Sequence, residues 1–137
     1  MIALAELERD VLVAAFAVSA GIHAALVPSH LAEGAGPAAG FLAAAALLGG
    51  LAVVLARRPS TTALLGAVAV LGGLLASYAL VITSGVPLLH PQPEQVDGLA
   101  LATKAVEVVG LVAAVQLARR PNPAPATFIP RPKGTTS

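Results

Sequence analysis

The stretch "GAGPAAGFLAAAALLGGLAVVLA", residues 34–56, contains no charged side chain. A helix rises about 1.5 Å per residue and the hydrocarbon core of a bilayer is about 30 Å thick, so this stretch is long enough to cross it. Polar backbone groups must be paired internally within lipid, and the stretch lacks the alternation of a strand. It therefore predicts a membrane-spanning helix, placed at residues 37–56.

The rest of the chain is also rich in long apolar runs. Three further apolar runs predict spans at residues 11–27, 61–83 and 97–118. Ser60 and Asp97 are predicted N-caps, because their side chains can accept hydrogen bonds from the first turn of a helix. Pro28 lacks an N–H group and predicts the end of the first helix, whereas Pro37 suits the first turn of the second. Residues 1–120 thus form one predicted domain, followed by a Pro-rich cytoplasmic tail at residues 121–137.

Composition agrees with a membrane protein. Hydrophobic residues make up 57% of the chain and charged residues 11%, whereas soluble domains are about a quarter charged. The lipid bilayer is therefore the predicted partner. The net charge of +1 and the absence of a basic stripe argue against nucleic acid. The absence of cysteine excludes disulfides and thiolate metal sites.

The basic residues predict the orientation. Seven of the eight Lys and Arg residues flank the spans on one side, namely Arg9, Arg57, Arg58, Arg119, Arg120, Arg131 and Lys133. By the positive-inside rule this side is cytoplasmic. The predicted fold is an all-α, four-helix transmembrane bundle with up-down-up-down topology and both termini in the cytoplasm. The start "MIALAELERD" lacks a basic leader region, so we expect the first span to be retained. The use of Ala, Gly and Arg is typical of a bacterial genome, which predicts the bacterial cytoplasmic (inner) membrane.

Four polar residues within the spans form a candidate ligand or proton site. Lys104 and Glu107 are three residues apart and share one helix face. Glu107 lies roughly 18 Å and His23 roughly 20 Å from the cytoplasmic flank of their helices, hence in one layer, with Tyr78 a few ångströms further out. An ionisable side chain at that depth costs about 3 kcal/mol, so these residues should face the bundle interior. The alternative is an ion pair that only fixes helix packing.

The outward loops hold a candidate metal site. Neutral imidazole binds Zn, Cu, Ni or Fe, and carboxylates bind harder ions. A divalent or copper ion would use residues of the two outer loops, His30, Glu33, His90 and Glu94. The alternative is that each is a solvated loop residue. His23 is about 10.5 Å from His30 on an unbroken helix, so one metal would join them only if Pro28 folded the chain back.

Other chemistry is weakly indicated. Bis-histidine haem or quinone electron transfer is a weaker alternative, since only His23 lies within a span. The sequence holds no catalytic motif, so we expect no enzyme and name no catalytic residue. Ser19, Ser29 and Ser84 lie near the predicted site, and we interpret them as caps or helix-bonded hydroxyls.

Two stripes of small residues at four-residue spacing allow close helix approach. They comprise Ala17, Gly21 and Ala25 in the first span and Ala69, Gly73 and Ser77 in the third. We expect them to pack within the bundle. The alternative is contact with a partner, as a homo-oligomer or within a larger membrane complex.

Two segments carry a family resemblance. "GIHAALVPSHLAE" (residues 21–33) and "GVPLLHPQPEQVDGLALATKAVEVV" (residues 85–109) resemble a group of small uncharacterised four-span bacterial membrane proteins. That group has a GIH–Pro–His–x–x–Glu element after the first helix and a Pro-Glu-Pro-like element before an acidic last helix. The matching residues here are Gly21, His23, Pro28, His30, Glu33, Pro93, Glu94, Asp97 and Glu107. The stretch "PQPEQVD" departs from the second element. The resemblance implies the fold and topology and no activity.

Two classes of function follow. In the first, an outward His/carboxylate mouth and a buried His/Lys/Glu layer bind or transport a small cation, proton or ligand. In the second, the chain is a non-catalytic accessory subunit of a larger membrane complex.

Overall fold

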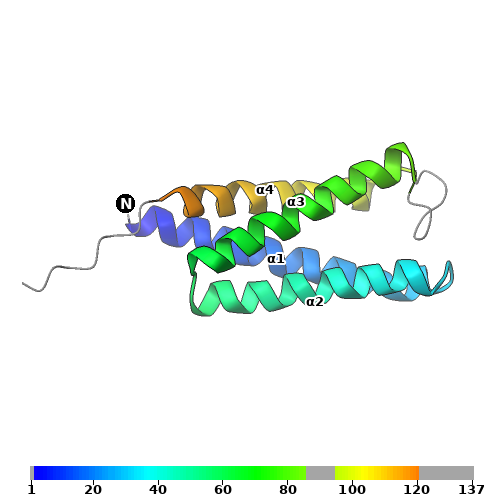
Figure 1. The fold of residues 1–137 in the computed structure, drawn as a ribbon, viewed down its shortest axis with the longest axis horizontal. Helices are drawn as coiled ribbons and strands as arrows, with labels where there is room; N and C mark the ends of the chain where they lie inside the picture. Colours follow the sequence, from blue (N-terminus) through cyan, green and yellow to red (C-terminus); the bar gives the residue numbers. More distant parts are fainter. Residues whose placement is uncertain (1, 86–94, 121–137) are drawn as a thin grey trace, which may run out of the picture.

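Four helices make up the described part of the protein. The computed structural model describes residues 2–85 and 95–120, which form four α-helices and no strand. The helices are α1 (Ile2–Leu31), α2 (Ala35–Arg57), α3 (Thr61–Thr83) and α4 (Gly98–Arg119) (Figure 1). By length and composition, each is long and apolar enough to cross a membrane. The prediction of an all-α fold with four spanning helices is thus confirmed.

The helices pack as a ring. α1 contacts α2 and α4, and α3 contacts α4 and, least extensively, α2. Figure 1 shows consecutive helices running in opposite directions. An ion pair of 2.7 Å between Arg120 and Glu8 joins the end of α4 to the beginning of α1. We call this end of the bundle the terminal end, and the end at which α1 gives way to α2 the far end.

Local sequence explains most helix boundaries. Ser60 accepts a hydrogen bond of 3.1 Å from the Ala63 N–H, and Asp97 accepts one of 2.7 Å from the Ala100 N–H, so both predicted N-caps are confirmed. Gly34 separates α1 from α2 with a φ of 148°, a conformation that favours glycine.

The first helix does not end at Pro28. α1 continues to Leu31 with Pro28 inside it, so that prediction is wrong. A proline removes one N–H donor from a helix, but helices within membranes tolerate this loss when nearby groups re-pair the backbone. The side chains of Ser29 and His30 both bond to the Leu26 carbonyl at 2.8 Å, within the last turns of the helix. Because α1 is continuous from Ile2 to Leu31, the chain does not reverse at Pro28 to bring His23 to His30.

The apolar core occupies the terminal half of the bundle. The largest completely buried apolar side chains come from α1, α2 and α3, namely Leu12, Phe16, Leu48, Leu55 and Leu71. They lie in the first half of α1 and α3 and the second half of α2, which meet at the terminal end. A Cβ at Gly110 would lie 3.0 Å from the Cβ of Ala15, so glycine there allows α4 to approach α1 closely. The far half contains the polar residues instead.

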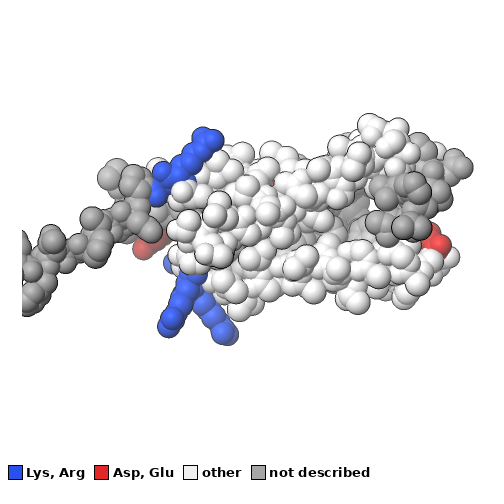
Figure 2. Space-filling model, in the orientation of Figure 1, with Lys and Arg blue, Asp and Glu red and all other residues white. Residues whose placement is uncertain are grey.

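The surface of the bundle is apolar. Leu42 and Leu65 are each 59% exposed, and the other large exposed hydrophobics include Leu47, Val53 and Val109. Lipid contact explains this surface, because a soluble protein rarely exposes so much contiguous apolar area. The basic side chains visible in Figure 2 gather at the terminal end, where α2 ends at Arg57 and α4 ends at Arg119.

The two stripes of small residues face outward. All six of their residues are exposed, namely Ala17, Gly21, Ala25, Ala69, Gly73 and Ser77. The expectation that they pack within the bundle is therefore wrong. The close approach is made at Gly110, which belongs to neither stripe. Contact of either stripe with a partner stays a prediction.

Candidate functional site

An ion pair on α4 forms the centre of the site. Lys104 Nζ donates a hydrogen bond of 2.7 Å to Glu107 Oε2. Glu107 is completely buried, and the side chain of Lys104 is 16% exposed. The two residues are one helical turn apart, so the pair forms within a single helix face. Both side chains point into the bundle, as expected for charged groups within a span.

Ser19 on α1 completes the pairing of the carboxylate. Its hydroxyl donates a hydrogen bond of 2.8 Å to Glu107 Oε1. The interpretation of Ser19 as a cap or helix-bonded hydroxyl is therefore wrong, although Ser29 and Ser84 do bond to their own helices. Both oxygens of Glu107 now have a donor, which compensates for the removal of the charge from water.

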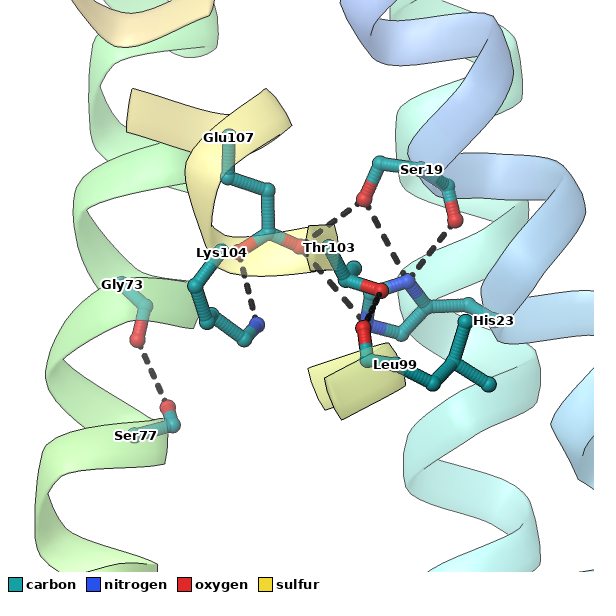
Figure 3. Close-up of polar contacts among 8 residues, drawn as sticks. All are labelled: Ser19, His23, Gly73, Ser77, Leu99, Thr103, Lys104 and Glu107. Carbon is teal, nitrogen blue, oxygen red and sulfur yellow. Dashed lines mark hydrogen bonds and ion pairs between the residues drawn. The ribbon is translucent and has the colours of Figure 1, made fainter. Parts of the chain in front are cut away.

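His23 joins the same group of side chains. Its Nδ1 lies 2.8 Å from the carbonyl oxygen of Ser19. A carbonyl only accepts, so Nδ1 carries the proton of that hydrogen bond. The other ring nitrogen, Nε2, lies 4.0 Å from Glu107 Oε1. We call Ser19, His23, Lys104 and Glu107 the polar cluster (Figure 3).

Tyr78 lies beside the polar cluster on α3. Lys104 Nζ is 5.4 Å from the centre of the Tyr78 ring, within the range of a cation–π contact. The Tyr78 hydroxyl is buried, and no atom of the described residues forms a hydrogen bond with it. The structure thus brings together the four residues predicted as a ligand or proton site, His23, Tyr78, Lys104 and Glu107.

A cavity of about 280 Å³ adjoins the polar cluster. Its polar wall contains His23, Tyr78, Thr103 and Lys104, whereas Ser19 and Glu107 lie behind that wall. Thr103 donates its hydroxyl to the Leu99 carbonyl at 2.8 Å. The other walls are mostly apolar and include Leu26, Phe41, Ala44, Leu74, Val81 and Ala100. The cavity extends toward the far end, where Pro37 and Asp97 line it.

Phe41 on α2 connects the two described histidines. Its ring stacks on His30 with a centroid separation of 3.9 Å, and its centroid lies 5.5 Å from that of His23. The sequence analysis did not identify Phe41. Both histidines lie on one helix and contact this ring, so they do not face each other across a space that could hold haem. The haem alternative would need His90 opposite His23, and because His90 lies outside the described residues it stays a prediction.

The predicted metal site is only partly described. Glu33 is exposed beyond the end of α1, and His30 is buried against Phe41. Within residues 2–85 and 95–120 there is no group of three His, Asp or Glu side chains that could hold a metal ion. His90 and Glu94 lie outside the described residues, so the metal site stays a prediction.

Most polar groups of the polar cluster are already paired with one another. Both carboxylate oxygens of Glu107 are paired, and the cation beside it is the tethered ammonium of Lys104. A metal ion at Glu107 would have to displace that ammonium. By contrast, Lys104 and Tyr78 can donate hydrogen bonds into the cavity. Among the described residues, Glu107 has no carboxylate oxygen without a donor.

One further residue of the cluster could have been found from the sequence. Ser19 precedes His23 by four residues, and side chains at this spacing share a helix face. Nothing in the sequence indicated that Ser19 faces Glu107, because Glu107 lies on a helix remote in sequence.

No protein-family model, curated protein or solved structure matches this chain. The resemblance to four-span bacterial membrane proteins therefore stays a prediction.

Proposed function

We propose that this chain is a polytopic membrane protein that binds a small molecule in the cavity beside the polar cluster. The observation that carries the proposal is the contact of Lys104 and His23 with a cavity of about 280 Å³, while Glu107 and Ser19 hold them from behind. Lys104 and His23 are thus available to a ligand on the cavity wall, and Glu107 is the residue that positions Lys104.

Packing alone accounts poorly for this arrangement. A buried ion pair can often be replaced by apolar side chains of similar volume without loss of stability. Polar residues within a membrane are costly, and where they occur they commonly mark a pathway or a binding site. The polar cluster also borders a cavity, whereas a pair that served only packing would be enclosed by side chains.

The flanking arginines support an orientation of the cavity in the membrane. The described arginines that flank the helices lie at the terminal end, and the cavity extends toward the far end. The positive-inside rule then assigns the terminal end to the cytoplasm. The cavity would thus lie in the outer half of the cytoplasmic membrane of a bacterium, with both chain termini inside the cell.

The test removes both charges together. In the Lys104→Met/Glu107→Gln double variant neither partner is left as an unpaired buried charge, so we expect it to fold. Protein purified in detergent from its host membranes is analysed by native mass spectrometry, and its melting temperature is measured with and without a lipid extract of those membranes. We expect a bound small molecule, and a stabilising response to the extract, in the wild type only.

A matched control is Gln116→Leu. It removes an exposed polar group from the terminal half of α4, away from the cavity. This variant should retain the bound molecule and the response. If the wild type carried no molecule and did not respond, or if the double variant behaved like the wild type, the proposal would be wrong.

A further inference from the structure

Two residues of the cavity wall, Lys104 and Tyr78, carry spare hydrogen-bond donors, whereas His23 Nε2 and the Asp97 carboxylate on the same wall are acceptors. Lys104 uses one N–H toward Glu107, and an ammonium group has further N–H groups to donate. The buried hydroxyl of Tyr78 has no partner among the described residues. Lys104 Nζ lies 5.4 Å from the centre of the Tyr78 ring, so both residues border the same part of the cavity. The complementary group on a ligand is an oxygen that accepts hydrogen bonds.

The charge of Lys104 is already balanced by Glu107, and the carboxylate on the cavity wall, Asp97, lies seven residues earlier at the start of α4. Lys104 and Glu107 form an ion pair of 2.7 Å, and both oxygens of Glu107 are paired. A positively charged ligand would meet the ammonium of Lys104. A negatively charged ligand would compete with Glu107 for that ammonium and leave a buried carboxylate without its cation. An uncharged ligand disturbs neither group, because a carbonyl oxygen needs only the spare donors.

The size and walls of the cavity suit a ring compound. A dry apolar cavity of roughly 150 Å³ holds one benzene ring. The cavity here, at about 280 Å³, is nearly twice as large. Its walls include the aromatic rings of Phe41 and Tyr78, which can stack with a ligand ring. One substituted or fused ring system would therefore fill it.

The rim of the cavity lies between α2 and α3. These two helices diverge from the terminal end toward the far end (Figure 1). Gly40 on α2 and Ser77 on α3 both line the cavity and are both exposed. By helical rise, Gly40 lies about 7.5 Å from the start of α2 and Ser77 about 9 Å from the end of α3. The rim is thus set back from the helix ends, at a depth where acyl chains surround the bundle.

We propose that the ligand is an uncharged, membrane-soluble ring compound with a carbonyl oxygen, which enters from the lipid between α2 and α3 and presents that oxygen to Lys104 and Tyr78. This inference rests on the proposed function and specifies its ligand class and its entry route. Quinones and aromatic ketones belong to this class.

The ligand class is tested with two probes of the same ring size. Menadione carries two ring carbonyls and 2-methylnaphthalene carries none. In thermal-shift titrations of the full chain in detergent, we expect menadione to bind about tenfold or more tightly, as hydrogen bonds to buried donors predict. Tyr78→Phe removes only a hydroxyl without a described partner. It should leave the melting temperature of the ligand-free protein unchanged and abolish most of the preference for menadione.

Ser77→Ala is the matched control for Tyr78→Phe. It removes a hydroxyl from the same cavity, but this hydroxyl already donates to the Gly73 carbonyl at 2.7 Å. It should leave the preference for menadione intact. Equal affinity of the wild type for the two probes would overturn the ligand class. So would a full preference in Tyr78→Phe.

The entry route is tested by fluorescence, because Tyr78 is the single tyrosine and the chain has no tryptophan. In vesicles of brominated phosphatidylcholine we expect lipid to quench Tyr78 more strongly than aqueous iodide does. A Cβ at Gly40 or at Gly50 meets no atom within 4 Å, so both glycines accept a larger side chain. Gly40→Leu should obstruct the rim and reduce the quenching by lipid. Gly50→Leu, outside the cavity on the same helix, should not.

Quenching mainly by iodide, or equal quenching by lipid in the two glycine variants, would overturn the lateral route. These failures differ from a failure of the proposed function. A small molecule that is lost from Lys104→Met/Glu107→Gln would still show that the cavity binds a ligand, of another class or by another route.

Discussion

Ser19 on α1 and Glu107 on α4 are 88 residues apart in sequence, yet the hydroxyl of Ser19 donates a hydrogen bond of 2.8 Å to Glu107 Oε1. Both side chains are completely buried. This bond joins two neighbouring helices of the ring, while the Lys104–Glu107 pair lies within α4 alone. The polar cluster therefore fixes the position of α1 against α4 as well as the direction of the carboxylate.

Ser19→Ala should destabilise the protein. The substitution leaves a buried carboxylate oxygen without its donor, which costs about 1–3 kcal/mol. Reversible unfolding in mixed detergent measures the change in the free energy of unfolding. Ser29→Ala on the same helix is the control, since Ser29 is exposed and bonds to its own helix, and it should change stability by no more than about 0.5 kcal/mol. Equal effects of the two substitutions would contradict the bond between α1 and α4.

Lys104 and Glu107 should show strong coupling. Lys104→Met or Glu107→Gln alone leaves an unpaired buried group, and breaking such a pair costs about 3–5 kcal/mol. The double variant leaves no charge, so it should be more stable than Lys104→Met. The same unfolding experiment on the four proteins gives a double-mutant cycle, which isolates the coupling. Additive effects of the two substitutions would show that the pair does not form.

Gly110→Ala should separate α1 from α4. The new methyl group would lie 3.0 Å from the Cβ of Ala15, which is fixed to the backbone and cannot rotate away. Overpacking of this kind costs about 1–3 kcal/mol. Gly73→Ala is the control, because a Cβ there meets nothing within 4 Å and alanine favours a helix by up to about 1 kcal/mol. A rise in melting temperature for both variants would contradict the close packing at Gly110.

The orientation can be tested with single cysteines, because the chain has none of its own. Ala32→Cys lies at the far end and Pro59→Cys between α2 and α3 at the terminal end. A membrane-impermeant maleimide should label Ala32→Cys in intact bacterial cells and Pro59→Cys only after the membrane is opened. The reverse pattern would place the arginines outside and would contradict the positive-inside assignment.

The sequence by itself determined the fold class. The uncharged run at residues 34–56 is followed and preceded by similar runs, and in lipid a helix pairs all backbone groups within one segment. Ser60 and Asp97 begin two of the helices through local hydrogen bonds. The Lys104–Glu107 pair was equally local, since residues three apart on a helix are neighbours. Pro28 misled the prediction because the loss of one N–H donor does not by itself end a helix within a membrane, and α1 continues to Leu31.

The tertiary structure alone decided which residues meet across helices. The alignment of α1 with α4 brought Ser19 to Glu107, and the packing of α2 on α1 placed Phe41 against both described histidines. The outward direction of both small-residue stripes was likewise settled by the rotation of each helix about its axis. Hydrophobicity around these helices is nearly uniform, because lipid and core are both apolar. A sequence of this kind therefore specifies that its helices cross the membrane and leaves the choice of facing sides to close packing at Gly110 and to the pairing of a few polar groups.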